Sequence, residues 1–401
     1  MDRGVNITDH IVWVGVNDYE THLFEALWPL PRGISYNAYL VRDEKVALID
    51  TVKEAFIGEL LGKIDRHTGG RGLDYLVVNH MEPDHSGAVA VLRRLYPEMQ
   101  IVGNAKTAEF LKEFFGVTEG IHVVADGDTL SLGTHTLQFH LTPMVHWPET
   151  MMTYATPGKV LFSGDAFGGF GALPGGIFDD EVDTEDYYDE TLRYFTNIVA
   201  KFARPTSKAI AKLADVDVGV VAATHGPVWR SDPKAIIERY DRWARGPAER
   251  GAVIVFGSMY ANTERMARAV GRGLAAAGVE QVRVHNASRT HPSYILNDLW
   301  LYRGYVLGTP TYNTQMLPTM EDVLRRAAAL PVADRVCGVF GTYGWSGGGV
   351  KAVRAAAEDA GWRLVEPVVE ARCAPSDADL DACGKLGANL ATALDGDSGG
   401  C

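Results

Sequence analysis

The chain has 401 residues, of which 46% are hydrophobic and 22% are charged, and these proportions are typical of a soluble globular protein. Its formal net charge of −13 argues against a nucleic acid or an anionic membrane as a partner, because either would bind a basic surface. The length favours two domains, and no signal peptide or membrane-spanning apolar run is apparent. We therefore expect a two-domain cytoplasmic protein.

The cysteines argue against an iron–sulfur or zinc module within the chain. Cys337, Cys373, Cys383 and Cys401 are scattered and form no C-x-x-C pair, which zinc knuckles, iron–sulfur clusters and rubredoxin-type iron sites require. We expect reduced thiols without a catalytic role.

Short strand-like runs and helices alternate over roughly the first 240 residues. Apolar runs predict strands at Val12–Val16, Ala38–Val41, Val46–Asp50 and Tyr75–Val78. Helical patterns cover Ala55–Ile64, Gly87–Tyr96, Glu185–Phe202 and Pro233–Arg245. Strand-rich segments followed by helices, in repeated order, predict a β-sandwich covered by helices, and we assign it residues 1–246.

One turn in this half carries four side chains that commonly bind metals. Asn79-His80-Met81-Glu82-Pro83-Asp84-His85-Ser86-Gly87 follows directly after an apolar strand. Alternate residues leaving a strand point to one side, which would align His80, Glu82 and Asp84 while His85 faces the other way. A solvated turn could hold one or two such residues by chance, but four in this order predict half of a two-metal site.

The turn resembles the H-x-[HE]-x-D-H metal motif of the metallo-β-lactamase fold. This resemblance implies three more ligands downstream, in the order His, Asp, His, each at a strand end. His146, Asp165 and His225 fit that order, since Asp165 and His225 each follow an apolar, strand-like run.

The pattern changes after a polar segment at residues 245–251, which contains Gly and Pro and is typical of a linker. Strands and helices then alternate regularly, which predicts a doubly wound parallel sheet of about five strands over residues 251–394. The expected strands are Ala252–Phe256, Val282–Val284, Tyr305–Leu307, Val336–Phe340 and Arg363–Val369. We expect the tail Asp395–Cys401 to be disordered.

Three polar loops follow neighbouring strands of this predicted sheet, and such loops meet at the edge where ligands bind. The first, Ser258–Thr263, precedes a helix and suits a single phosphate, although a Ser and a Thr in that place more often only cap the helix. It lacks the glycine patterns of dinucleotide and nucleoside triphosphate loops. The expected cofactor-binding residues are Ser258, Met259, Tyr260, Asn262, Thr263, Thr309, Pro310, Thr311, Tyr312, Asn313, Thr342, Tyr343, Gly344, Trp345, Ser346 and Gly347.

The three loops together resemble those of flavodoxin, which binds FMN. In that resemblance Ser258–Thr263 is the phosphate loop and the other two loops flank the isoalloxazine ring. Tyr312 and Trp345 are the candidates for stacking on the flat ring, whereas aromatic residues that merely pack the sheet edge are the alternative.

A metallo-β-lactamase-like domain followed by a flavodoxin-like domain resembles the flavodiiron proteins, also called A-type flavoproteins. Zinc hydrolases of this fold have a histidine where this chain has Glu82, and the exchange gives a harder donor set that suits iron. The resemblance implies that one iron is bound by His80, Glu82 and His146, the other by Asp84, His85 and His225, and that Asp165 bridges them.

The resemblance also implies an oxidoreductase that reduces O2 to water, NO to N2O, or both, with electrons relayed through FMN. It implies a head-to-tail homodimer or a dimer of such dimers. The electrons would come from a separate donor: rubredoxin, a flavin reductase or reduced deazaflavin. The alternative function is a two-zinc hydrolase of the glyoxalase II or lactonase type, fused to a flavodoxin domain.

Overall fold

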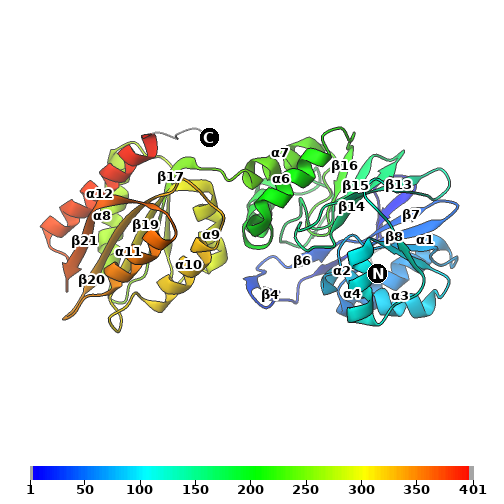
Figure 1. Cartoon of the computed structure of the whole chain (residues 1–401), viewed down its shortest axis with the longest axis horizontal. Helices are drawn as coiled ribbons and strands as arrows, with labels where there is room; N and C mark the ends of the chain where they lie inside the picture. The colour runs from blue at the N-terminus through cyan, green and yellow to red at the C-terminus, as the bar shows by residue number, and fades with distance from the viewer. Residues whose placement is uncertain (1–2, 397–401) are drawn as a thin grey trace. The chain divides into compact units, whose positions relative to one another are not determined.

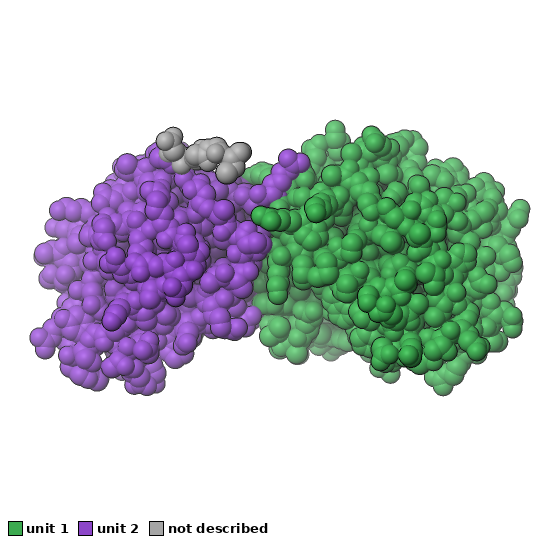
Figure 2. Space-filling view, viewed as in Figure 1, with its two compact units in different colours: residues 1–244 green, residues 245–401 purple. Residues whose placement is uncertain are grey.

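The computed structural model describes residues 3–396, and the chain divides into two compact units, residues 1–244 and 245–401 (Figure 2). Within the described residues, no helix combines the length and the apolar character needed to cross a membrane. Most of the tail that was expected to be disordered, residues 397–401, lies outside the described residues. Asp395 does not belong to a disordered tail, because it ends helix α12 (Asp377–Asp395) and pairs with Arg250.

The first unit contains two large sheets (Figure 1). In order across the first, the strands are β1 (Val5–Asn6), β2 (Ile11–Trp13), β7 (Tyr39–Arg42), β8 (Val46–Ile49), β9 (Tyr75–Val77), β10 (Gln100–Gly103) and β11 (Ile121–Val123). Across the second they are β12 (Thr129–Ser131), β13 (Thr136–Leu141), β14 (Met151–Thr156), β15 (Val160–Phe162) and β16 (Val220–Ala222). Two small ribbons pair β3 (Val16–Asp18) with β6 (Ile34–Tyr36) and β4 (Leu23–Phe24) with β5 (Trp28–Pro29).

The core of this unit lies between the two sheets, because alternate residues along the strands point inward. Ala47 and Ile49 of β8 belong to the same buried cluster as Leu137 and Phe139 of β13. Two sheets packed in this way, with helices in the connections between parallel strands, confirm the predicted sandwich.

Several helices connect parallel neighbours or close the unit. They are α1 (Ile57–Thr68), α2 (Pro83–Ser86), α3 (Val89–Leu95), α4 (Ala105–Phe115), α5 (Thr184–Tyr194), α6 (Ala203–Lys212) and α7 (Pro233–Ala244). The expected helix Gly87–Tyr96 is α3, which begins two residues later and ends one residue earlier, and the short helix α2 precedes it. The expected helix Glu185–Phe202 is α5, which continues through a π-helical turn at Phe195–Val199 and a 3-10 turn at Ala200–Phe202 into α6.

The second unit is a five-stranded parallel sheet, as predicted (Figure 1). In order across it, the strands are β18 (Val282–Asn286), β17 (Glu249–Phe256), β19 (Tyr302–Pro310), β20 (Val336–Tyr343) and β21 (Arg363–Arg372). Its helices, besides α12, are α8 (Asn262–Ala276), α9 (Pro292–Leu301), α10 (Pro318–Ala328) and α11 (Gly349–Asp359).

Both faces of this sheet are buried. Ile254 of β17 packs with Val270 of α8 and Leu390 of α12, whereas Val255, the next residue of β17, packs with Ile295 of α9 on the opposite face. The chain runs from β17 outward to β18 and then back past β17 to β19. The strand order therefore reverses between β17 and β19, and such a reversal leaves a crevice at the carboxyl ends of the strands.

Candidate functional site

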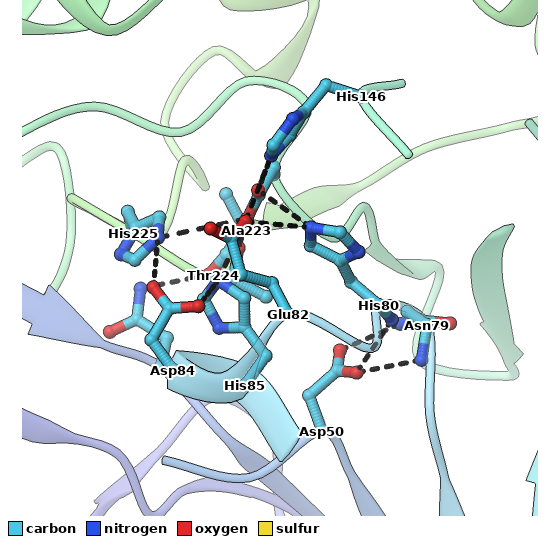
Figure 3. A network of polar contacts seen from close by, with 12 residues as sticks. Asp50, Asn79, His80, Glu82, Asp84, His85, His146, Ala223, Thr224 and His225 are labelled. Carbon is cyan, nitrogen blue, oxygen red and sulfur yellow. Dashed lines mark hydrogen bonds and ion pairs between the residues drawn. The ribbon is translucent and has the colours of Figure 1, made fainter. Parts of the chain in front are cut away.

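The structure brings together the seven candidate metal ligands of the first unit. Figure 3 labels all of them except Asp165. All of them lie in segments that follow strands. His80 and Glu82 come after β9, and Asp84 and His85 lie on α2. The other three follow strands of the second sheet: His146 follows β13, Asp165 follows β15 and His225 follows β16.

The ligand atoms fall into two groups, and the first consists of His80, Glu82, His146 and Asp165. His146 Nε2 lies 3.1 Å from Glu82 Oε2 and 3.0 Å from Asp165 Oδ2. His80 Nε2 lies 3.2 Å from that Glu82 oxygen and 3.4 Å from Asp165 Oδ2. Two imidazole nitrogens and two carboxylate oxygens therefore converge on one point.

The second group consists of Asp84, His85 and His225, and it faces the other oxygen of Asp165. His85 Nε2 lies 3.1 Å from Asp165 Oδ1 and 3.4 Å from Asp84 Oδ1. His225 Nε2 lies 3.4 Å from Asp84 Oδ2 and 3.8 Å from Asp165 Oδ1. Asp165 thus presents one carboxylate oxygen to each group, which is the geometry a bridging ligand needs.

The expected alignment of His80, Glu82 and Asp84 on one side is wrong beyond Glu82. The chain is extended at Glu82, but Pro83 begins α2, and Pro is favoured at the first position of a helix. The helical turn rotates Asp84 away from Glu82 and places it beside His85 instead.

Buried polar atoms without partners indicate that this site fits metal ions. Both carboxylate oxygens of Asp84 and the Nε2 atoms of His85 and His225 are buried and form no hydrogen bond among the described residues. Their nearest polar neighbours are other ligand atoms, at 3.1–3.4 Å. Such atoms are costly unless something pairs with them. The donors are four imidazoles and three carboxylates, a mixed nitrogen and oxygen set that suits iron.

The charges of the site are strongly coupled in the protein without metal. Burial alone would lower the pKa of His85, but the carboxylates of Asp84 and Asp165 outweigh it and raise this pKa to about 9. Burial alone would also lower the pKa of His146, but the carboxylates of Asp165 and Glu82 outweigh it and raise this pKa to about 9. Burial would raise the pKa of Glu82, yet the His146 and His80 imidazoles hold it well below its usual range.

Outer contacts hold several ligands in place, and no motif in the sequence indicated them. Glu149, at the start of the β14 region, lies with Oε1 2.8 Å from His80 Nδ1. The Thr224 hydroxyl donates to Asp165 Oδ1 at 2.5 Å, and Asp50 Oδ1 accepts from the His80 backbone N–H at 3.3 Å. These partners orient imidazoles and carboxylates toward the site.

A pocket of about 620 Å³ opens beside Glu82 and Asp84. Its lining includes apolar side chains of Leu23 and Phe24 as well as the Glu25 carboxylate. Burial and the neighbouring Glu82 carboxylate raise the pKa of Glu25 to about 7. The pocket gives a small molecule a partly apolar approach to the ligand groups.

The second unit has its own pocket, of about 600 Å³, at the carboxyl ends of the strands where the strand order reverses. Most of the predicted cofactor-binding residues line it: Ser258, Met259, Tyr260, Asn262, Thr263, Pro310, Thr311, Tyr312, Asn313, Thr342, Tyr343, Gly344, Trp345 and Ser346. Trp345 is 92% exposed and Tyr312 is 44% exposed, so both rings are free to cover a flat ligand.

Two predicted residues lie outside the lining of this pocket. The hydroxyl of Thr309 is bonded to Pro310 O and Leu317 N, and Gly347 is on the loop beyond. Thr314 and Cys373 line the pocket but were not predicted. Cys373 follows β21, which extends three residues beyond its expected end at Val369, so the predicted strand stopped short of this edge.

The first loop fits a phosphate. Helix α8 begins after Ala261 without a side-chain cap, which leaves first-turn N–H groups for a ligand. The buried Oγ of Ser258 has no partner among the described residues. An uncapped helix start with a partnerless hydroxyl beside it is suited to a single phosphate group, as FMN carries.

Replacing Ser258 by alanine is expected to weaken FMN binding about tenfold or more. A hydrogen bond to a charged group contributes roughly 1.5–3 kcal/mol, and the alanine side chain offers none. Fluorescence titration of FMN into the flavin-free protein measures the change in Kd. The exposed Ser288, on the loop after β18, serves as the matched control, and Ser288→Ala should leave Kd unchanged. Equal affinity in Ser258→Ala would remove this hydroxyl from the phosphate site.

Comparison with known proteins covers both units. A family model described as ODP family beta lactamase matches residues 34–226, and the flavodoxin family model matches residues 254–387. A Moorella thermoacetica protein named nitric oxide reductase is 35% identical over 399 residues, which cover 98% of this chain and 100% of that protein. The anaerobic nitric oxide reductase flavorubredoxin of Klebsiella pneumoniae is 34% identical over 391 residues, 96% of this chain and 81% of that protein.

Solved structures match over almost the whole chain as well. The rubredoxin oxygen:oxidoreductase of Desulfovibrio gigas has a TM-score of 0.93 at 30% identity and covers 98% of both chains. The flavodiiron protein of Giardia intestinalis has the same TM-score at 26% identity, over 98% of this chain and 97% of that one.

Proposed function

The chain belongs to the flavodiiron proteins, and on that premise we propose that it reduces O2 to water, NO to N2O, or both, at a di-iron centre supplied with electrons through FMN. It is an oxidoreductase with a metallo-β-lactamase-like domain, which we place at residues 1–246, and a flavodoxin-like domain, which we place at 251–394.

One observation carries the proposal: two groups of ligand atoms share Asp165. The same chain has a second pocket, on a doubly wound sheet, with a loop suited to bind a phosphate. We propose that the ligands of one iron are His80, Glu82 and His146, that those of the other are Asp84, His85 and His225, and that Asp165 bridges them. FMN would be held by the lining of the second-unit pocket, with its phosphate at Ser258 and the α8 N-terminus.

The electron count suits both gases. When bound, two ferrous ions and a reduced FMN supply four electrons, enough to turn O2 into two waters, whereas two electrons suffice to couple two NO molecules into N2O and water. The chain contributes the positions: Asp165 fixes the spacing of the two ligand groups, and Leu23 and Phe24 line an apolar approach suited to a small neutral gas.

The alternative of a two-zinc hydrolase fused to a flavodoxin domain is not favoured. Relatives that match over nearly the full chain carry oxidoreductase names. In addition, a hydrolase would have no use for the second pocket, which is large enough for a flavin and has aromatic side chains beside it.

We further propose a separate electron donor and a dimeric assembly. The name of the Desulfovibrio gigas relative supports rubredoxin as the donor, and a flavin reductase or reduced deazaflavin is the alternative. A head-to-tail homodimer, or a dimer of such dimers, would bring the FMN of one subunit to the di-iron centre of another. A fully active monomer in analytical ultracentrifugation would contradict this assembly. The free thiols of Cys337, Cys373 and Cys383 support a reducing, cytoplasmic location.

The function is tested by stopped-flow oxidation of the fully reduced, iron-loaded protein by O2 and by NO, side by side. We expect rapid oxidation of the flavin by at least one gas, with water or N2O as the product and without release of peroxide. Protein that binds two zinc ions in preference to iron and hydrolyses thioesters, without consuming either gas, would overturn the proposal.

A further inference from the structure

The two proposed iron sites have the same formal donors. Each contains two imidazoles and one carboxylate of its own, and each receives one oxygen of the shared Asp165. Counting ligand charges alone, the two ions would be bound equally tightly. Any difference between them must come from what the ligands themselves contact.

The first group has an anionic outer partner. Glu149 is fully buried, and its Oε1 accepts a hydrogen bond from the Met81 backbone N–H at 2.8 Å while lying 2.8 Å from His80 Nδ1. An ionised carboxylate only accepts hydrogen bonds, so in the contact with Glu149 the proton belongs to His80 Nδ1. The lone pair of His80 is then on Nε2, which faces Glu82 and Asp165. A carboxylate behind an imidazole makes the imidazole a stronger electron donor.

Among the described residues, no carboxylate outside the ligand set accepts a hydrogen bond from an imidazole of the second group. The buried Asp50 carboxylate interacts with His85 through space only, because its hydrogen bonds come from Asn79 and the His80 backbone N–H. His225 Nδ1 donates to a neutral backbone carbonyl, that of Ser35, at 2.7 Å, and His85 Nδ1 has no hydrogen-bond partner. The Thr224 hydroxyl donates to Asp165 Oδ1, the oxygen that faces this group. That hydrogen bond withdraws electron density from Oδ1, while Oδ2, which faces the first group, receives no such donor from Thr224.

We propose that Glu149 and Thr224 together polarise the centre, so that the ion held by His80, Glu82 and His146 is bound more tightly and has the lower reduction potential. The proposal deepens the proposed function and rests on its ligand assignment. Both residues are positioning residues, since each acts through a ligand and neither faces the ions. Both residues increase the difference between the two ions, because Glu149 strengthens electron donation to the first and Thr224 weakens electron donation to the second.

The expected size follows from outer partners in other metal sites, whose loss typically lowers metal affinity 10- to 100-fold. A tenfold change in the relative stability of the two oxidation states at one ion corresponds to about 59 mV for one electron. A preference of this size is large enough to decide which site fills first when metal is scarce.

The experiment uses the full-length, FMN-loaded protein after removal of metal by a chelator. One equivalent of Fe(II) per chain is added anaerobically, and anomalous scattering at the iron edge locates it in crystals. We expect most of the iron at His80, Glu82 and His146. Chelator competition then gives the two stepwise affinities, and a redox titration followed by electron paramagnetic resonance gives the two potentials.

Two variants carry the test. Glu149→Gln keeps the shape and the acceptor for Met81 but removes the charge, so the ratio of the stepwise affinities should fall about tenfold and the two potentials should approach each other by about 59 mV. Thr224→Val removes the hydroxyl that draws electron density from Asp165 Oδ1, so the second ion should be bound more tightly. The affinity ratio and the difference between the two potentials should therefore both decrease. Thr153→Val is the matched control: its buried hydroxyl donates to Asn79 and contacts no ligand, so both quantities should stay unchanged.

Equal occupancy of the two sites by the first iron, or preference for the Asp84 site, would overturn the inference. So would a Glu149→Gln protein with an unchanged affinity ratio, or a Thr153→Val protein that changes as much as Glu149→Gln does. If Glu149→Gln does not fold, Thr224→Val decides by the same measurements. A wild-type protein that binds fewer than two irons would instead refute the proposed di-iron centre itself, so the two failures are distinguishable.

Discussion

Replacing Asp165 by asparagine is expected to lower the rate of O2 and NO reduction by at least about 10³-fold, equivalent to roughly 4 kcal/mol in the barrier. Asp165 faces both ligand groups, one oxygen to each. An asparagine has a single oxygen and would turn an N–H donor toward one of the groups, where it repels a metal ion. The loss of the bridge should therefore empty at least one site.

Iron analysis and stopped-flow oxidation measure this outcome together. FMN content should remain unchanged, because the flavin pocket lies in the other unit. Asp126→Asn is a suitable control, since Asp126 is a carboxylate of the same unit that pairs with Lys212 and belongs to neither ligand group. An Asp165→Asn protein that keeps two irons and more than a tenth of the rate would disprove the bridging role.

Without metal, the first unit is expected to lose stability as pH rises from about 6.5 to 9. The pKa values of His85 and His146 are both raised to about 9 in the folded protein, against about 6.5 for an unfolded histidine. A raised pKa contributes stability that is fully present below pH 6.5 and is lost as pH rises through 9. The two histidines share carboxylate partners, so we expect a combined loss of roughly 3 kcal/mol.

Iron loading should reverse this trend, because metal ions bind deprotonated imidazoles and their affinity grows with pH. Urea unfolding at pH 6, 7.5 and 9 measures how the free energy of unfolding changes with pH, once for the chelated protein and once for the iron-loaded protein. Flavin release reports the second unit separately and serves as the internal control, which should not follow the histidine titration. A metal-free first unit with equal stability at pH 6 and pH 9 would show that folding does not raise the pKa values of these imidazoles.

The sequence predicted much of the fold because its signals were local. Apolar runs such as the one before His80 mark strands, and the change to regular strand–helix alternation after residue 245 marks the second unit. The downstream candidate ligands came from the order that the resemblance to the metallo-β-lactamase motif implies, and Asp165 and His225 also follow apolar, strand-like runs. The same logic pointed to the loops that line the pocket of the second unit, apart from Thr314 and Cys373.

What the sequence could not predict depends on contacts between distant residues or on the exact start of a helix. Glu149 lies 69 positions from His80, and Thr224 lies 59 positions from Asp165, so no spacing rule connects them. The division of the first motif into two groups depends on α2 beginning at Pro83, a one-turn helix too short to have a periodic signature.

The order of the ligands along the chain has a consequence for how the protein is made. The first group is complete once Asp165 has been synthesised, but the second waits for His225, which is 60 positions later (225 − 165). At roughly 5–20 residues per second, ribosomes need about 3–12 s to cover that distance. During that interval the growing chain already contains every donor of one site and lacks the last imidazole of the other. Iron supplied during synthesis would therefore meet a chain that contains every donor of one site, and the segment after strand β16 adds the remaining ligand last.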